Sequence, residues 1–158
     1  MLEKTVVLLK VPEWDPDSKT ISALVEEDLN RLGFKYKSIG IYLDEAELSN
    51  IYSNLNELIF NTTIAQLAFQ PLQVFRVYGD NAVNVIHNLK GTKTEPLECD
   101  ISSWRHRLAL KFRAVRHVKL RRCDGSHIVT IVNNFVHAPG SDDVERNIQV
   151  FRKYFGQI

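Results

Sequence analysis

The sequence predicts a single domain that combines helices and strands, as an α+β or an α/β fold, and three observations support this prediction. The chain has 158 residues, which is the length of one domain. Hydrophobic residues make up 44% of the chain and charged residues 25%, as in ordinary globular proteins. Strand-like and helix-like spacings of apolar residues alternate along the chain, and this alternation fits parallel and antiparallel sheets equally well.

Three segments in the first half of the chain have the composition of strands. Thr5–Val11 is an apolar run with several β-branched residues, and Pro12 ends it. Phe34–Leu43 alternates more weakly, whereas Leu72–Tyr78 is a compact apolar run that ends at Gly79. We therefore expect strands at these three positions.

Helices are predicted between and after these strands, because apolar residues there recur at intervals of three and four. Asp44 and Glu47 have the spacing of a capping box, and Asp80 is expected to cap the helix that Gly91 ends. The predicted helices cover residues 18–32, 44–55, 56–70, 80–90 and 144–155.

A long polar segment and a β-hairpin are predicted before the last helix. Residues 91–104 form the polar segment, and long loops in compact domains are often functional. Arg105–Arg122 and Ile128–Val132 flank the turn sequence Cys123-Asp124-Gly125-Ser126, which is typical of a hairpin.

The charge balance and the cysteine content exclude several classes of protein. The 20 basic and 19 acidic residues give a net charge of +1, which argues against a globally basic nucleic-acid binder. Two cysteines without a CxxC pair make neither a disulfide scaffold nor a cysteine-rich metal site. The N-terminus lacks a signal-peptide pattern, and no apolar stretch is long enough for a membrane span. We therefore expect a cytoplasmic protein with no membrane partner.

Among the five histidines, His137 is the strongest candidate for chemistry. It follows an apolar strand and precedes the turn Ala138-Pro139-Gly140-Ser141-Asp142. A neutral imidazole at the end of a strand can act as a nucleophile or as a general base. The alternative is a histidine at the edge of the sheet without a catalytic role.

Segments along most of this chain resemble the nucleoside diphosphate kinase family. The end of that family, with its active-site histidine and last helix, is similar to NNFVHAPGSDDVERNIQVFRKYF, and its first strand is similar to TVVLLKVPEWD. The family's strand–helix–loop passage is similar to RVYGDNAVNVIHNLKGTKTEP, and its arginine-bearing loop is similar to SSWRHRL. The intervals between the matching residues agree with those of the family for Tyr52, Phe60, Thr94 and Arg105, and for Asn134 with His137.

The resemblance implies a fold, a reaction and partners. The fold is a ferredoxin-like antiparallel sheet with covering helices, formed by residues 1–158 as one domain with an inserted β-hairpin. The reaction is transfer of the terminal phosphate of a nucleoside triphosphate to a nucleoside diphosphate, by a ping-pong route through a phosphohistidine. Mg²⁺ is expected to arrive with the nucleotide, without a metal site in the protein. A homo-oligomer, either hexamer or tetramer, is also implied.

The resemblance assigns the transfer step to four residues. His137 attacks the terminal phosphate, while Lys10, Thr94 and Arg105 hold phosphate oxygens and stabilise the charge of the transferring group. Lys10 has an alternative interpretation, because lysines at strand ends commonly just meet solvent. Thr94 and Arg105 have no obvious packing role, which favours function.

Three further residues are implied to position the nucleophile and the nucleoside. Tyr52 orients the nucleophile or the phosphate, Phe60 stacks on the base, and Asn134 binds the ribose with help from Lys10. Tyr52 and Phe60 lie among apolar residues, so an ordinary place in the core is the alternative for both.

Three departures from the family pattern predict weaker nucleotide binding or slower transfer. His87 stands where a phosphate-binding arginine is usual, and a neutral imidazole does not replace a guanidinium. Pro139-Gly140 separates the histidine's neighbour from Ser141, the candidate for the family's serine contact. Asn147 stands in place of the glutamate that orients the histidine. The alternative function is therefore a catalytically weak or silent protein that binds nucleic acid or protein through the hairpin.

An insertion at about residues 106–131 is not explained by the family pattern. Arg105–Arg122 contains eight basic residues and no acidic one, whereas the rest of the chain has 12 basic and 19 acidic residues. This segment is either an ordinary positive surface or an electrostatic site for nucleotides, oligomer contacts or nucleic acid. Nucleic acid is the weaker prediction, because only Trp104 and Phe112 are aromatic there.

Overall fold

The computed structural model describes the backbone of residues 1–158 apart from 53–54, 113–114, 123–124, 133 and 156–158. Side chains are described outside residues 53–54, 113–133 and 156–158. In the described part of the chain, no helix is both long enough and apolar enough to cross a membrane.

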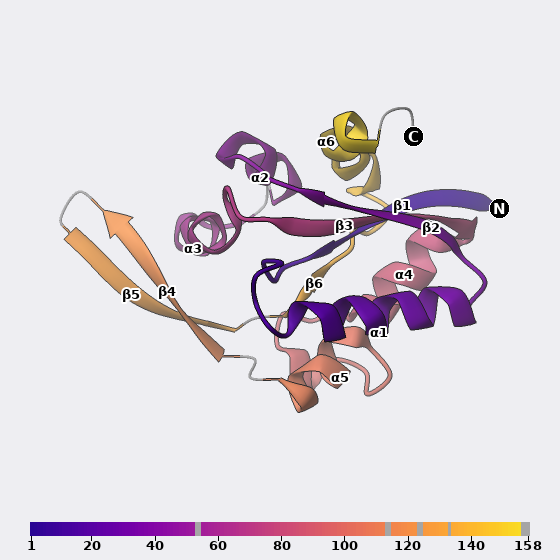
Figure 1. The fold of residues 1–158 in the computed structure, drawn as a ribbon, viewed down its shortest axis with the longest axis horizontal. Coiled ribbons are helices and arrows are strands. Elements are labelled where there is room, and N and C mark those ends of the chain that lie inside the picture. The colour runs from indigo at the N-terminus through magenta and orange to yellow at the C-terminus, as the bar shows by residue number, and fades with distance from the viewer. Residues whose placement is uncertain (53–54, 113–114, 123–124, 133, 156–158) are drawn as a thin grey trace.

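A four-stranded antiparallel sheet forms the centre of the molecule (Figure 1). Its order is β2-β3-β1-β6, and the strands are β1 (Leu2–Leu9), β2 (Lys35–Ile41), β3 (Leu72–Asp80) and β6 (Val136–His137). Every neighbouring pair is antiparallel. This topology confirms the ferredoxin-like α+β fold and excludes the parallel sheet that the periodicity also allowed.

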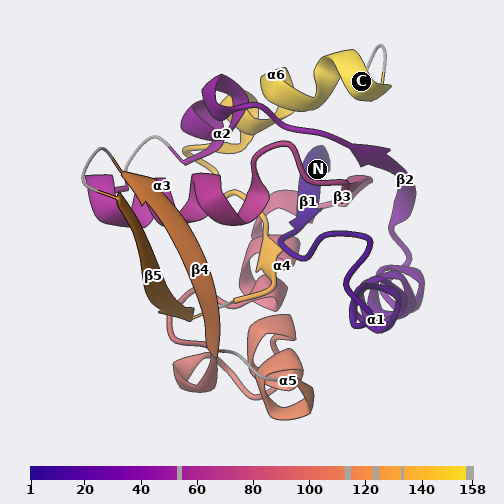
Figure 2. The ribbon, with the colours of Figure 1, turned by 60° about the vertical axis from the view of Figure 1, so that its left-hand side comes forward.

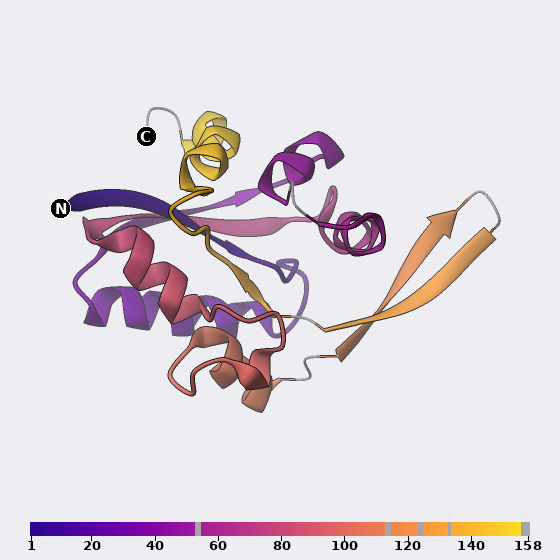
Figure 3. The same ribbon diagram turned by 180° about the vertical axis from the view of Figure 1, so that it is seen from behind.

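Helices cover both faces of this sheet, and they bury the inner strand β1 on both sides. Val7 and Leu9 of β1 pack into one core cluster, and Val6 and Leu8 pack into the other. Helices α1 (Ser18–Arg31) and α4 (Ala82–Lys90) cover the first face, whereas α2 (Glu45–Ile51) and α6 (Val144–Phe155) cover the second. Figure 3 shows the two groups of helices on opposite sides of the sheet.

Local sequence signals explain where several elements begin and end. The capping box of α2 is present, because the Glu47 amide donates to Asp44 at 2.8 Å and the Asp44 amide donates to Glu47 at 3.1 Å. The last helix has the predicted bounds, Val144–Phe155. The expected cap at Asp80 is wrong, because β3 continues through Asp80 and Asn81 is the N-cap of α4, with a left-handed φ of 53°.

The segment from Arg105 onward is partly a helix, which corrects the prediction of one long strand. Helix α5 covers Trp104–Lys111 and follows a one-turn 3-10 helix, η1 (Pro96–Glu98), in the predicted loop. The Ser103 side chain caps α5 by accepting from the His106 amide at 3.2 Å, and Trp104 and Leu108 are buried one turn apart. The cap and this spacing favour a helix over a strand.

The hairpin is present and forms a sheet of its own. Its strands are β4 (Val115–Arg122) and β5 (Gly125–Val132), paired antiparallel from Val115 opposite Val132 to Arg122 opposite Gly125. Of the predicted turn at residues 123–126, residues 123–124 lie outside the described residues, whereas Gly125 and Ser126 belong to β5. The hairpin extends from the body of the molecule, and β4 lies beside α3 (Glu57–Leu67) (Figure 2).

Candidate active site

His137 is held by a hydrogen bond that determines which ring nitrogen is free. Its Nε2 lies 2.7 Å from Oδ1 of Asn147, a fully buried residue on α6. The Asn147 amide nitrogen donates to the Asp143 carbonyl at 3.0 Å, so its oxygen faces the imidazole as an acceptor. His137 therefore carries its proton on Nε2, and Nδ1 keeps the lone pair of a nucleophile.

The surroundings of His137 keep its imidazole neutral. Burial and, after it, the nearby charges of Lys90, Lys10 and Arg105 lower the pKa of His137 to about 3. The hydrogen bond to Asn147 acts in the opposite direction but does not compensate. At neutral pH the ring is thus neutral, with Nδ1 unprotonated and able to attack an electrophile.

Lys10 and Asn134 form a pair next to His137. The Lys10 ammonium donates to Asn134 Oδ1 at 2.8 Å, and the Lys10 amide donates to the Phe135 carbonyl at 2.7 Å. The backbone bond ties the end of β1 to the segment that leads into β6. Burial, followed by repulsion from Arg105 and Lys90, lowers the pKa of Lys10 to about 7.

Tyr52 faces the histidine from the end of α2. Its ring centroid lies 4.9 Å from that of His137, and the Lys10 ammonium lies 5.6 Å from the Tyr52 centroid. The Tyr52 hydroxyl is buried and has no hydrogen-bond partner within the described part of the chain. A buried hydroxyl of this kind is costly without a ligand, although the same ring also packs against the core cluster of α2 and α6.

Arg105 reaches the same region from α5. Its guanidinium donates to the Lys93 carbonyl at 2.9 Å and to the Val136 carbonyl at 3.2 Å, next to His137. The buried Nε of Arg105 has no partner among the described residues. Gly91 permits this approach, because a side chain there would come within 3.1 Å of Arg105 Cβ.

The other predicted residues lie around this centre. Thr94 is exposed on the loop after α4, Phe60 is half-buried on α3, and Ser141 is exposed in the turn before α6. The described contacts of His137 include none of these three side chains, so their assigned roles stay predictions. His87 lies on α4 with Nδ1 3.2 Å from the Ala138 carbonyl.

Lys90 belongs to the site, although the sequence did not single it out. This lysine is only 6% exposed, and its ammonium donates to the Ala138 carbonyl at 2.9 Å. It also lies 3.2 Å from His87 Nδ1. Two signals could have indicated it: the spacing of three from His87, which places both on one helix face, and the position directly before Gly91.

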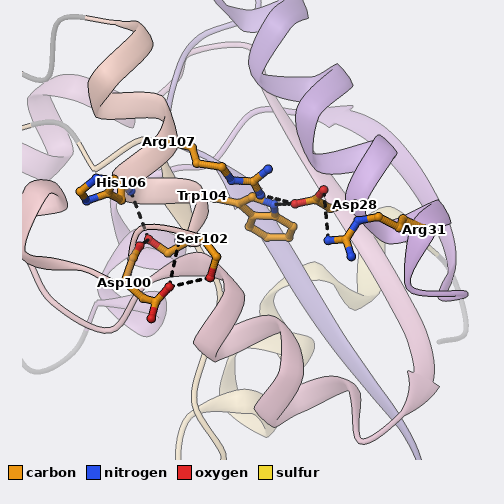
Figure 4. A network of polar contacts seen from close by, with 8 residues as sticks. Asp28, Arg31, Asp100, Ser102, Trp104, His106 and Arg107 are labelled. Atoms are coloured by element: carbon orange, nitrogen blue, oxygen red, sulfur yellow. Dashed lines mark hydrogen bonds and ion pairs between the residues drawn. The ribbon is translucent and has the colours of Figure 1, made fainter.

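A network on the far side of α5 holds this helix in place. Asp28 of α1 accepts from Trp104 Nε1 at 2.8 Å and forms ion pairs with Arg107 and, at 3.4 Å, with Arg31 (Figure 4). A cavity of about 720 Å³ lies beside this network, lined by residues of α1, α4 and α5 including Arg31 and Arg107. The lining does not include His137.

The arrangement suits a polyanionic substrate. Lys10, Lys90 and Arg105 surround a neutral imidazole, and none of them takes part in an ion pair that the structure describes. A phosphate offers the negative charge that these cations lack and an electrophilic phosphorus for the histidine. Within the described residues, no group of three or more His, Cys, Asp or Glu side chains is arranged to hold a metal ion.

Comparison with known proteins shows similarity in structure rather than in sequence. No family model matches the sequence, and no curated protein matches it significantly. A nucleoside diphosphate kinase from Borrelia burgdorferi, solved with vanadate and ADP, matches 95% of this chain and 86% of its own, with a TM-score of 0.66 and 19% identity.

Two archaeal structures give similar results. The Halobacterium salinarum nucleoside diphosphate kinase, solved with CDP, has a TM-score of 0.68 and 17% identity over 96% of this chain and 88% of its own. The Pyrobaculum aerophilum enzyme has a TM-score of 0.67 and 16% identity over 96% of both chains. These matches span nearly the whole chain, and this protein therefore has the fold of the nucleoside diphosphate kinases.

Proposed function

We propose that this protein is a nucleoside diphosphate kinase that works through a phosphohistidine at His137. The observation that carries the proposal is the hydrogen bond from His137 Nε2 to Asn147, which leaves Nδ1 free in a neutral ring. The surrounding cations favour a phosphate as the group that this nitrogen attacks.

The reaction proceeds in two balanced steps. Nδ1 of His137 attacks the terminal phosphorus of a nucleoside triphosphate, and the bond from that phosphorus to the bridging oxygen breaks. The electron pair leaves with the nucleoside diphosphate. A terminal oxygen of a second nucleoside diphosphate then attacks the phosphohistidine, and the phosphorus–nitrogen bond breaks to restore the neutral ring.

The side chains around His137 have complementary roles in this proposal. Lys10 and Arg105 bind phosphate oxygens, helped by Thr94, and stabilise the charge that spreads over the transferring group. The Tyr52 hydroxyl donates to the phosphate or to its bridging oxygen. Buried donors without partners on Tyr52 and Arg105 support this assignment, since a bound phosphate satisfies both.

The nucleoside is held with few contacts to the base edge. Asn134, oriented by Lys10, binds the ribose hydroxyls, and Phe60 stacks on the base. Ser141 and His87 lie on the turn and helix that flank the histidine. Mg²⁺ enters as part of the magnesium–nucleotide substrate, bound by phosphate oxygens, which are ligands that this ion prefers.

A labelling experiment tests the proposal. The protein is incubated with ATP labelled on the terminal phosphate, and we expect an acid-labile, alkali-stable phosphoenzyme that discharges onto added GDP. His137→Ala should abolish the label, whereas the matched control His106→Gln should retain it. Absence of label in the wild type contradicts the proposal and favours a silent binding protein. Label that persists in His137→Ala contradicts the proposal because another residue then carries the phosphate.

The proposal includes a homo-oligomer, hexamer or tetramer. Strand β2 is an edge of the central sheet, and unpaired edges are common sites of association between chains. Light scattering after size exclusion measures the mass. A mass of one subunit at working concentration contradicts this part of the proposal and leaves the phosphoenzyme test unaffected.

A further inference from the structure

Lys90 ends α4 in a position that a lysine rarely occupies. Its side chain is 6% exposed, and the contacts described for its ammonium are the Ala138 carbonyl at 2.9 Å and His87 Nδ1 at 3.2 Å. Neither partner carries a negative charge. An ammonium has three N–H groups, so at least one donor remains for a further partner.

The charges near Lys90 do not explain its burial. Arg105 on α5 repels it, and the opposing effects of Cys99, just after η1, and of Asp143, in the turn before α6, are smaller. The Asp143 carboxylate is itself paired with Arg146 at 2.7 Å. A buried cation of this kind is costly unless an anion compensates it.

The position of Lys90 points to the anion. Among the three cations that act on His137, Lys90 has the largest effect, ahead of Lys10 and Arg105. Its ammonium donates to the carbonyl of Ala138, the residue that directly follows the candidate nucleophile. His87 lies one turn earlier on the same helix, and its Nδ1 is 3.2 Å from both the Lys90 ammonium and the Ala138 carbonyl.

We propose that Lys90 is a phosphate-binding residue of this site, whose ammonium donates to a phosphate oxygen of the bound nucleotide and supplies the charge that the imidazole of His87 does not. This inference rests on the proposed function, because it requires a nucleotide whose phosphates lie beside His137. It assigns to α4 a cation that the sequence pattern did not indicate.

Nucleotide binding through Lys90 should change the number of protons bound to the protein. Burial and the charge of Arg105 lower the pKa of Lys90 to about 7, so the amine is mostly neutral at pH 8 without a ligand. A bound phosphate stabilises the ammonium, and nucleotide binding should therefore take up protons. Lys10 lies under the same influences and contributes its own share.

Calorimetry of ADP binding at pH 8, in buffers with different ionisation enthalpies, measures both affinity and proton uptake. The variants are Lys90→Met, which removes the charge, and Lys90→Arg, which keeps it permanently. Lys19→Met, on the exposed start of α1, is the matched control. Thermal melts verify that each variant is folded.

We expect Lys90→Met to bind ADP about 10- to 100-fold more weakly than the wild type, the usual loss for a charge-assisted contact. It should also take up about one proton fewer, as expected for a lysine whose amine is neutral at that pH. Lys90→Arg should keep most of the affinity while it also loses that proton. Wild-type affinity and proton uptake in Lys90→Met overturn the proposal. If Lys90→Met does not fold, unchanged proton uptake in folded Lys90→Arg overturns it.

The two proposals fail in different ways. A wild type that binds ADP with Lys90-dependent proton uptake but forms no phosphohistidine contradicts the proposed function and retains the role of Lys90. A wild type that forms the phosphohistidine while Lys90→Met binds ADP normally contradicts the role of Lys90 alone. A wild type that binds no ADP contradicts both.

Discussion

At the scale of single residues, a hydrogen bond to a neutral side chain, rather than to a carboxylate, orients the His137 ring and selects its tautomer. Asn147 accepts from Nε2 and has no charge of its own, so it orients the ring without favouring an imidazolium. The departure that the sequence indicated at Asn147 thus retains the orienting function. What changes is the electrostatic support for the charge that forms during transfer.

Substitution of Asn147 separates orientation from charge. Asn147→Leu removes the acceptor, frees the tautomer of His137, and should slow phosphohistidine formation by about 100-fold or more, as the loss of other histidine-orienting groups does. Asn147→Asp keeps an acceptor and adds a charge, so its rate should stay near or above that of the wild type. Rapid-quench labelling measures both rates, and equal rates for Leu and Asn at position 147 contradict the assigned orientation.

The acid stability of the protein should report the burial of His137. Its pKa is about 3 in the folded state and about 6.5 when unfolded, so the unfolded state binds more protons between these values. Stability therefore falls as the pH falls from about 6.5 to 3, by about 2 kcal/mol at pH 5 from this group alone. Urea unfolding at several pH values should show a shallower acid slope for His137→Gln. An unchanged slope contradicts a neutral, buried His137.

At the scale of elements, α5 connects stability to the site. Trp104 and Arg107 attach the helix to Asp28 of α1, while Arg105, between them in the sequence, extends toward His137. The same short helix thus has an anchoring side and a functional side. Asp28 has no described contact with the candidate nucleophile, so we expect it to influence the site only through the placement of Arg105.

Removal of the Asp28 charge should loosen this helix. Asp28→Asn breaks the ion pair with Arg107 in a buried place and should lower the free energy of unfolding by roughly 1–3 kcal/mol. The shift should be absent in the control Glu27→Gln, an exposed carboxylate on the same helix. Burial raises the pKa of Asp28, but its hydrogen bonds and ion pairs together outweigh burial and lower the pKa overall. The difference between Asp28→Asn and the wild type should therefore shrink as the pH falls below 4. If Asp28→Asn is as stable as the wild type at pH 7, the inference that Asp28 holds α5 in place is contradicted.

At the scale of the whole molecule, the net charge of +1 conceals an uneven distribution. The basic segment Arg105–Arg122 is divided between α5, which belongs to the body, and the first strand of the hairpin. A second concentration of positive charge, formed by Lys10, Lys90 and Arg105, lies inside the body around His137. These three side chains, for which the structure describes no ion pair, lie where we propose that phosphates bind.

The ligand-free protein should be more stable at alkaline pH, because the buried amines of Lys10 and Lys90 are then neutral. Lys10 and Lys90 have pKa values of about 7 in the folded state, whereas a free lysine has about 10.4. The unfolded state therefore binds more protons across this window, and stability rises as the pH increases from 7 toward 10. Melting temperatures between pH 7 and 9.5 should show a rise that is smaller in Lys90→Met. A wild-type melting temperature that falls over this range contradicts the burial of both charges.

Much of the fold could be predicted because its signals are local. Apolar periodicity located the strands and helices, and the capping box at Asp44 fixed the start of α2. The segment from Arg105 was mispredicted because its basic residues merged with the β-rich run that follows. The cap at Ser103 and the spacing of Trp104 and Leu108 were the signals that indicated the helix.

The sequence by itself determined most of the helices and strands of the body, the resemblance to a family, and the candidate pair His137 and Asn147. The tertiary structure confirmed the antiparallel sheet, which the resemblance implied and periodicity left open. It alone showed that His137 Nδ1 is the free nitrogen and that Lys90 is buried beside Ala138. The reason is that periodicity records which face of an element is apolar. Strand direction, tautomer and desolvation of a charge depend instead on partners that folding brings from distant parts of the chain.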